Sequence, residues 1–170
     1  MWKQLAMAAL LGASLLACTS SGLPGPQEND RVNAPTVIDD VVAAYEAVRA
    51  RLANDESDGL RAAFERLATA ALDTAEKAGS SALSDHLKKV ASAAEGFDGA
   101  DLSSARVTFA EASSHLVSAI AADPSLAAGL SIFECPMAEN YPKWVQGSTP
   151  KANPYMGKEM QSCGVESQWE

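Results

Sequence analysis

The chain has 170 residues, a formal net charge of −9 and three cysteines, and 47% of its residues are hydrophobic. This length suits one domain with a core of its own. Because so acidic a chain repels the phosphates of nucleic acids and of anionic lipids, we expect no nucleic-acid partner.

The first 17 residues predict a secretory signal peptide. Lys3 precedes an apolar run from Leu5 to Ala17, which is shorter than the roughly 20 residues needed to span a bilayer. Leu15, Ala17 and Cys18 resemble the lipobox of bacterial lipoproteins. The resemblance implies that Cys18 carries lipid such as palmitate, becomes the mature N-terminus and attaches the protein to a membrane. A signal peptide with a chance cysteine stays the alternative.

Residues 18–35 predict a flexible tether, because they are rich in Ser, Gly, Pro, Asn and Asp. Loss of Lys3 with the signal peptide takes the formal charge from −9 to −10. Lipid, rather than a charged face, would therefore hold the domain to the membrane. By analogy with enterobacterial sorting, Thr19 after the lipidated cysteine favours the outer membrane over the inner one. We expect the domain to face the periplasm.

Four helical segments follow, each with apolar residues at steps of three and four. They are expected at about 36–53, 57–78, 81–95 and 101–122. The short links between them contain turn and capping residues. The sequence therefore predicts an all-α fold, with an antiparallel four-helix bundle over residues 36–123. The expected apolar stripes are Val37, Val41, Tyr45, Val48 and Leu52; Leu60, Phe64, Leu67, Ala71 and Ala75; Leu83, Leu87, Val90 and Ala94; and Leu102, Phe109, Leu116 and Ile120.

Residues 124–170 are expected to pack on the bundle as a sulfur-rich segment. Within it, Phe133–Trp144 and Asn153–Gly164 together hold two of the three cysteines and three of the five methionines. Residues 130–135 predict a short extended segment, and a loop follows.

A short helix is expected near the end of this segment. Asn153 suits an N-cap and Pro154 the first helical position, and the helix should end at about Cys163. On such a helix Met156, Met160 and Cys163 would share one face.

The sulfur atoms allow three interpretations. Thiolate and thioether ligands select soft ions, so we expect a site for Cu(I), with Ag(I) as a second candidate. Its ligands would be Cys135, Met137, Met160 and Cys163, with Met156 as an additional ligand. Alternatively, Cys135 and Cys163 form a disulfide, as periplasmic cysteines commonly do. In the third interpretation, the methionines pack in a core.

The stretch CPMAENYPKW…NPYMGKEMQSCG resembles the ending of an uncharacterised bacterial helical domain family. Its members occur as secreted or lipid-anchored proteins and at the C-terminus of periplasmic adaptor subunits of copper/silver (heavy-metal) efflux pumps. The resemblance covers roughly Val37 to Val165, and it departs from the family pattern at Glu134 and Met156. It implies a role in heavy-metal handling, with periplasmic components of an efflux system as partners. The matching positions are Cys135, Pro136, Met137, Trp144, Asn153, Pro154, Tyr155, Gly157, Met160, Cys163 and Gly164.

No catalytic constellation accompanies these residues. The sequence has no glycine-rich phosphate loop, no GxSxG, no HExxH and no CxxCH motif, so we expect no enzyme. His86 and His115 are expected to be structural or solvated, and Trp144 to anchor the loop on the bundle. The resulting hypothesis is an envelope lipoprotein that buffers Cu(I) or passes it to efflux. The competing hypothesis is a helical interaction module stapled by a Cys135–Cys163 disulfide, without metal.

Overall fold

The computed structural model describes residues 36–79, 81–99, 101–147 and 150–169. The structure is mostly helical, and the four expected helices are confirmed with ends within a few residues of those predicted. They are α2 (Asp39–Ala53), α3 (Leu60–Ala78), α4 (Ala82–Glu95) and α5 (Leu102–Ala122). Within the described ranges, no helix is long and apolar enough to cross a membrane. The expected signal peptide, the lipidated Cys18 and the tether lie outside the described residues.

Local hydrogen bonds account for two of the helix starts. The Ser81 hydroxyl accepts the Ser84 N–H at 3.2 Å and caps α4. At the start of α5, Asp101 accepts the Ser104 N–H at 2.7 Å, while the Ser104 hydroxyl accepts the Asp101 N–H at 3.2 Å. Such reciprocal capping satisfies donors that have no partner inside the helix.

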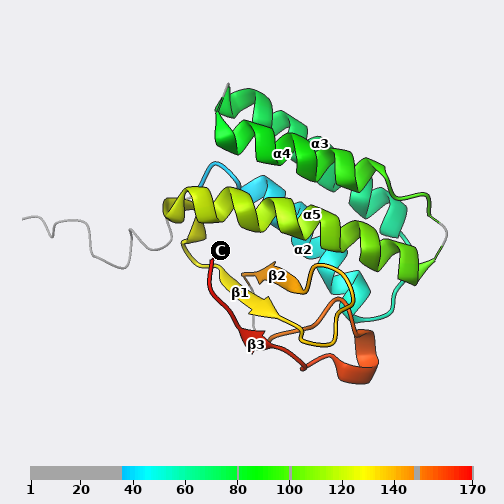
Figure 1. The fold of residues 1–170 in the computed structure, drawn as a ribbon. Coiled ribbons are helices and arrows are strands. Elements are labelled where there is room, and N and C mark those ends of the chain that lie inside the picture. The colour runs from blue at the N-terminus through cyan, green and yellow to red at the C-terminus, as the bar shows by residue number, and fades with distance from the viewer. Residues whose placement is uncertain (1–35, 80, 100, 148–149, 170) are drawn as a thin grey trace, which may run out of the picture.

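The helices and a small sheet form successive layers. In Figure 1, α3 and α4 lie on one side of α2 and α5, and the sheet lies on the other side, where it contacts α5. The core forms between these layers. Of the predicted stripe residues, Val37 is exposed, Leu83 and Leu102 are half-buried, and the others are buried.

The sheet corrects the expectation of an all-α fold. Its strands are β1 (Ser131–Glu134), β2 (Lys143–Gln146) and β3 (Val165–Glu166), antiparallel in the order β2-β1-β3. The expected extended segment at 130–135 is confirmed as β1. The other two strands were missed because two to four residues are too few to establish an alternating pattern.

The predicted helix from Pro154 to Cys163 is wrong. The structure has turns around one short 3₁₀ helix, η2 (Gly157–Met160). Gly157 has φ +59°, which an α-helix cannot contain. Met156, Met160 and Cys163 therefore do not form one helical face.

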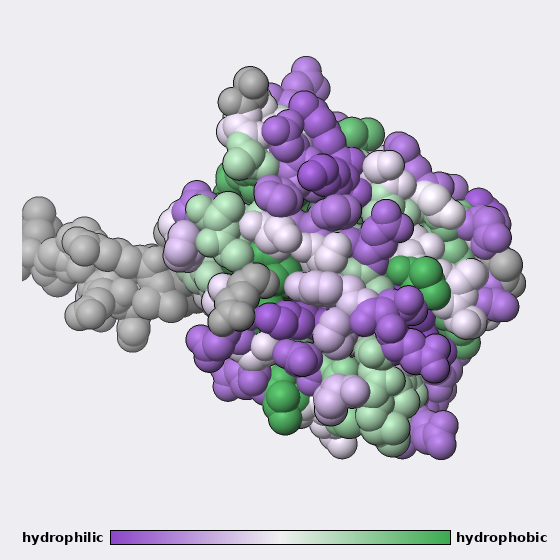
Figure 2. All heavy atoms as spheres, in the orientation of Figure 1, coloured by the Kyte–Doolittle hydropathy of each residue, from purple (hydrophilic) through white to green (hydrophobic). Residues whose placement is uncertain are grey.

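Polar residues predominate on the face of the molecule in Figure 2, with apolar residues scattered between them. The exposed large apolar side chains come from separate parts of the chain. They are Val37, Leu72, Val107, Met137 and Val165.

Candidate functional site

Strand pairing brings the two cysteine-bearing segments together. Glu134 at the end of β1 pairs with Val165 at the start of β3. Continuing this register by one residue places Cys135 opposite Gly164, the neighbour of Cys163. No disulfide joins Cys135 and Cys163 in this structure; Cys135 is fully buried and Cys163 is half-buried.

Two of the predicted methionine ligands share a surface groove of about 280 Å³ between α5 and the loops that follow β1 and β2. Met137 is 57% exposed at this groove, and Met156 is half-buried. We call it the methionine groove; its lining residues are Ser103, Arg106, Val107, Met137, Ala138, Glu139, Asn140, Tyr155 and Met156. Met160 and the two cysteines are not among them. The predicted five-sulfur set is therefore divided between the groove, the buried Cys135 and the η2 region.

Tyr155 lies between the methionine groove and the core. Its ring centroid is 6.0 Å from those of Phe109 and Trp144, and its hydroxyl donates to the Lys143 carbonyl at 2.7 Å. Burial raises the pKa of Tyr155 well above its usual value, and nearby Tyr45, Tyr141 and Cys135 raise it further. Tyr155 is thus a neutral wall of the groove that packs against the aromatic core.

Asn153 organises the loop that carries Met156. Its side chain is fully buried, and its Oδ1 accepts the N–H groups of Tyr155 at 2.8 Å and Met156 at 3.2 Å. Its Nδ2 donates to the Cys163 carbonyl at 3.1 Å, and its backbone N–H donates to the Gln161 carbonyl at 2.7 Å. The predicted capping role of Asn153 is therefore realised in a turn rather than in an α-helix.

Trp144 lies on β2 rather than in the expected loop, and it anchors the sheet. It is fully buried, and its ring centroid lies 5.5 Å from that of Phe133 on the neighbouring strand. A Cβ on Gly164 would come within 2.6 Å of Trp144 Cη2, so only glycine fits beside this ring. Trp144, Asn153 and Gly164 thus hold the C-terminal segment together.

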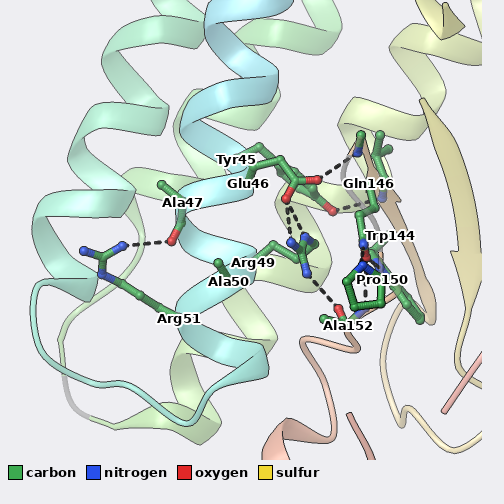
Figure 3. Close-up of polar contacts among 12 residues, drawn as sticks. Tyr45, Glu46, Ala47, Arg49, Ala50, Arg51, Trp144, Gln146, Pro150 and Ala152 are labelled. Carbon is green, nitrogen blue, oxygen red and sulfur yellow. Dashed lines mark hydrogen bonds and ion pairs between the residues drawn. The ribbon is translucent and has the colours of Figure 1, made fainter. Parts of the chain in front are cut away.

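Sequence reasoning missed the polar contacts between α2 and this segment (Figure 3). The buried Arg49 donates to Glu46 at 2.7 Å and to the Ala152 carbonyl at 2.8 Å. Glu46 in turn accepts the Gly147 N–H at 3.0 Å. The Gln146 amide accepts the Ala152 N–H at 3.1 Å. The available signal was the position of Glu46 and Arg49, which directly follow Tyr45 and Val48 at the edge of the apolar stripe. Charged groups that are buried there need hydrogen-bonding partners.

The histidines do not line the groove. His86 lies on α4 and His115 on α5. Burial lowers the pKa of His115, as do nearby Lys89 and His86, against an opposing effect of Glu111. Across the ranges that the structure describes, no group of three or more His, Cys, Asp or Glu residues could hold a metal ion.

A larger groove, of about 530 Å³, lies between α2 and α3. Alanine, threonine and charged side chains line it, including Asp40, Glu65 and Lys77. It has no sulfur ligand, so the methionine groove is the better candidate for soft-ion chemistry.

Comparison with protein-family models, with curated proteins and with solved structures found no match for this chain.

Proposed function

We propose that the protein is an envelope lipoprotein that binds a soft metal ion, Cu(I) before Ag(I), at the methionine groove together with the Cys135 thiol. One observation carries the proposal: Met137 and Met156 line one groove, and Met137 follows the buried Cys135 by two residues. Polarisable thioether and thiolate sulfurs favour Cu(I) over harder ions.

The burial of the sulfurs assigns them different roles. Met137 is 57% exposed and would make the first contact with an incoming ion. Met156 would be the second thioether, and Cys135, two residues before Met137, would bind as a thiolate after losing its proton. Cys163 would reach the same ion from the neighbouring position in the β1–β3 register, and Met160 would contribute only if its loop moved.

The ion would be buffered or passed to a periplasmic component of a heavy-metal efflux system. An exposed thioether suits such a transfer, because one ligand can be exchanged before the others release the ion. Lipid on Cys18 would hold the domain at the outer membrane. We further propose that the four helices form an antiparallel bundle, since short links join consecutive packed helices.

A Cu(I) titration in competition with a chromophoric chelator tests this function. The reduced mature chain would carry Cys18→Ser, so that Cys135 and Cys163 supply the only thiols. We expect capture of one ion. Met137→Leu/Met156→Leu should weaken binding at least about tenfold, roughly 1.4 kcal/mol, and Cys135→Ser/Cys163→Ser should abolish it.

Met160→Leu is the matched control and should bind nearly as tightly as the parent chain, because Met160 neither lines the groove nor belongs to the β1–β3 register that brings the cysteine segments together. Unchanged binding in the Met137/Met156 variant would refute the groove as the site. Unchanged binding in the double cysteine variant would refute the role of the thiols.

A second candidate function is an interaction module stapled by a Cys135–Cys163 disulfide. The observation that favours it is the structural use of Trp144, Asn153 and Gly164, together with the register that brings the cysteine segments side by side. The disulfide would close a loop of roughly 29 residues and contribute about 3–4 kcal/mol in the chain-entropy model. Thiol titration of freshly isolated protein distinguishes the candidates. Two free thiols favour the metal site, whereas none, with a reduction-sensitive Tm, favours the staple.

A further inference from the structure

The turn between α2 and α3 contains an unusual backbone conformation. Asp55 has φ +52°, the only positive φ at a non-glycine residue in the described ranges. This left-handed conformation is unfavourable for residues with a side chain, although aspartate tolerates it better than most. Backbone strain of this kind tends to persist where surrounding contacts require it.

The Asp55 carboxylate joins two distant parts of the chain. Its Oδ1 accepts from Arg106 Nη2 on α5 at 2.5 Å, and its Oδ2 accepts the Lys158 N–H at 2.9 Å. Arg106 also donates to the Leu52 carbonyl at 3.2 Å and to the Pro154 carbonyl at 3.0 Å. The pair therefore ties the end of α2 and α5 to the loop of residues 154–161.

Gly157 completes this contact from the loop side. It is buried, and its φ is +59°. A Cβ at this position would lie 1.9 Å from Asp55 Oδ1 and 2.7 Å from Arg106 Nη2. Asp55 and Gly157, both in the left-handed conformation, therefore lie in close contact at the Asp55 carboxylate. Gly157 also directly follows Met156 in the chain. We call the contact of Asp55, Arg106 and Gly157 the latch.

The loop that the latch contacts is also stabilised by hydrogen bonds within itself. Asn153 holds Tyr155, Met156 and Cys163 together through the hydrogen bonds described above. Arg106 and Met156 both line the methionine groove. A change in the latch should therefore move the loop as a unit and alter the wall of the groove that carries Met156.

We propose that Asp55 is a positioning residue: with Arg106 and Gly157 it holds the loop of residues 154–161 in place and so keeps Met156 in the groove that Met137 also lines. The role of Met156 as a ligand rests on the proposed function. The claim that Asp55 keeps the loop of residues 154–161 in place does not.

The loop is tested first without metal, in the mature Cys18→Ser chain. Amide hydrogen exchange and the alkylation rate of each cysteine would be compared between Asp55→Asn and the parent chain. We expect Lys158 exchange and Cys163 alkylation to rise at least about tenfold, because charge-assisted hydrogen bonds are lost. Exchange in α3 and α4 should stay unchanged. Glu56→Gln is the matched control, since it removes the neighbouring exposed carboxylate and should behave as the parent chain.

Two results would overturn the latch. The first is equal exchange in Asp55→Asn and Glu56→Gln. The second is an equal rise in α3, α4 and at the buried Cys135, which would indicate a general loss of stability. Gly157→Ala provides an independent variant, because its Cβ would displace the carboxylate while leaving both charges in place. It should reproduce the local opening, and normal protection in this variant would also overturn the latch.

Cu(I) competition then tests the positioning of Met156. Asp55→Asn should weaken binding by about tenfold in the parent chain and cause no further weakening in the Met156→Leu background. Equal weakening in both backgrounds would overturn the positioning role. If the parent chain captures no Cu(I), the proposed function and the positioning of Met156 both fail, and the exchange experiment alone decides whether the latch holds the loop.

Discussion

Replacing Asn153 with alanine should destabilise the domain strongly, although the side chain is small and uncharged. Its amide makes three hydrogen bonds, to the N–H groups of Tyr155 and Met156 and to the Cys163 carbonyl. Asn153 is itself fully buried. A neutral hydrogen bond contributes about 1 kcal/mol net, and a buried group left without a partner costs about 1–3 kcal/mol.

Because Met156 and Cys163 are half-buried, water can replace part of what is lost. We therefore expect Asn153→Ala to lower the free energy of unfolding by about 2–4 kcal/mol. Urea unfolding at neutral pH, followed by tryptophan fluorescence, measures this change. Asn140→Ala is the matched control, because Asn140 is exposed and its loss should cost less than about 0.5 kcal/mol. Equal small losses in the two variants would refute the assignment of Asn153 as the organiser of the loop.

Three further predictions concern other parts of the domain. Gly164→Ala would place a Cβ 2.6 Å from Trp144 at φ +124°. It should therefore lower the free energy of unfolding by about 2–3 kcal/mol and shift the tryptophan emission. An unchanged spectrum and an unchanged stability would contradict the close approach. Tyr45→Phe removes a buried hydroxyl that hydrogen-bonds to Ser113 and accepts the Val145 N–H. Urea unfolding should show a decrease of about 1–2 kcal/mol in the free energy of unfolding. An unchanged free energy would contradict the stabilising role of these two hydrogen bonds. The lowered pKa of His115 means that the unfolded chain binds its proton more tightly, so the contribution of His115 to stability should fall as pH drops through about 6.5. His115→Gln should therefore reduce the loss of stability between pH 7 and pH 5, and an identical slope in both proteins would show that other groups cause that loss.

The helices were predictable because their signals are local. The apolar periodicity that includes Tyr45, Phe64 and Phe109 repeats within each segment, and Ser81 and Asp101 cap helices within three residues of themselves. These interactions form between residues close in sequence and need no knowledge of the rest of the chain.

The candidate site was predictable only in part. The order of residues showed that two cysteines and three methionines lie near the end of the chain. It did not establish which of their sulfur atoms come together in the fold. The expected Met156–Met160–Cys163 face depended on an α-helix that Gly157 prevents by its left-handed conformation beside Asp55. The shared groove of Met137 and Met156 requires α5 as its other wall, and no spacing along the chain indicates that wall.

Local patterns along the chain were thus enough to predict the four helices, the place of the sulfur-rich segment and a capping role for Asn153. Folding was needed to pair β1 with both β2 and β3, to bring Arg49 and Arg106 to loop carbonyls far along the chain, and to bury Cys135 while leaving Met137 exposed. The two groups of features differ in the range of the interactions that form them. Helix periodicity and capping act over a few residues, whereas strand pairing, burial and the coordination of one carboxylate by two segments exist only after distant parts of the chain have met.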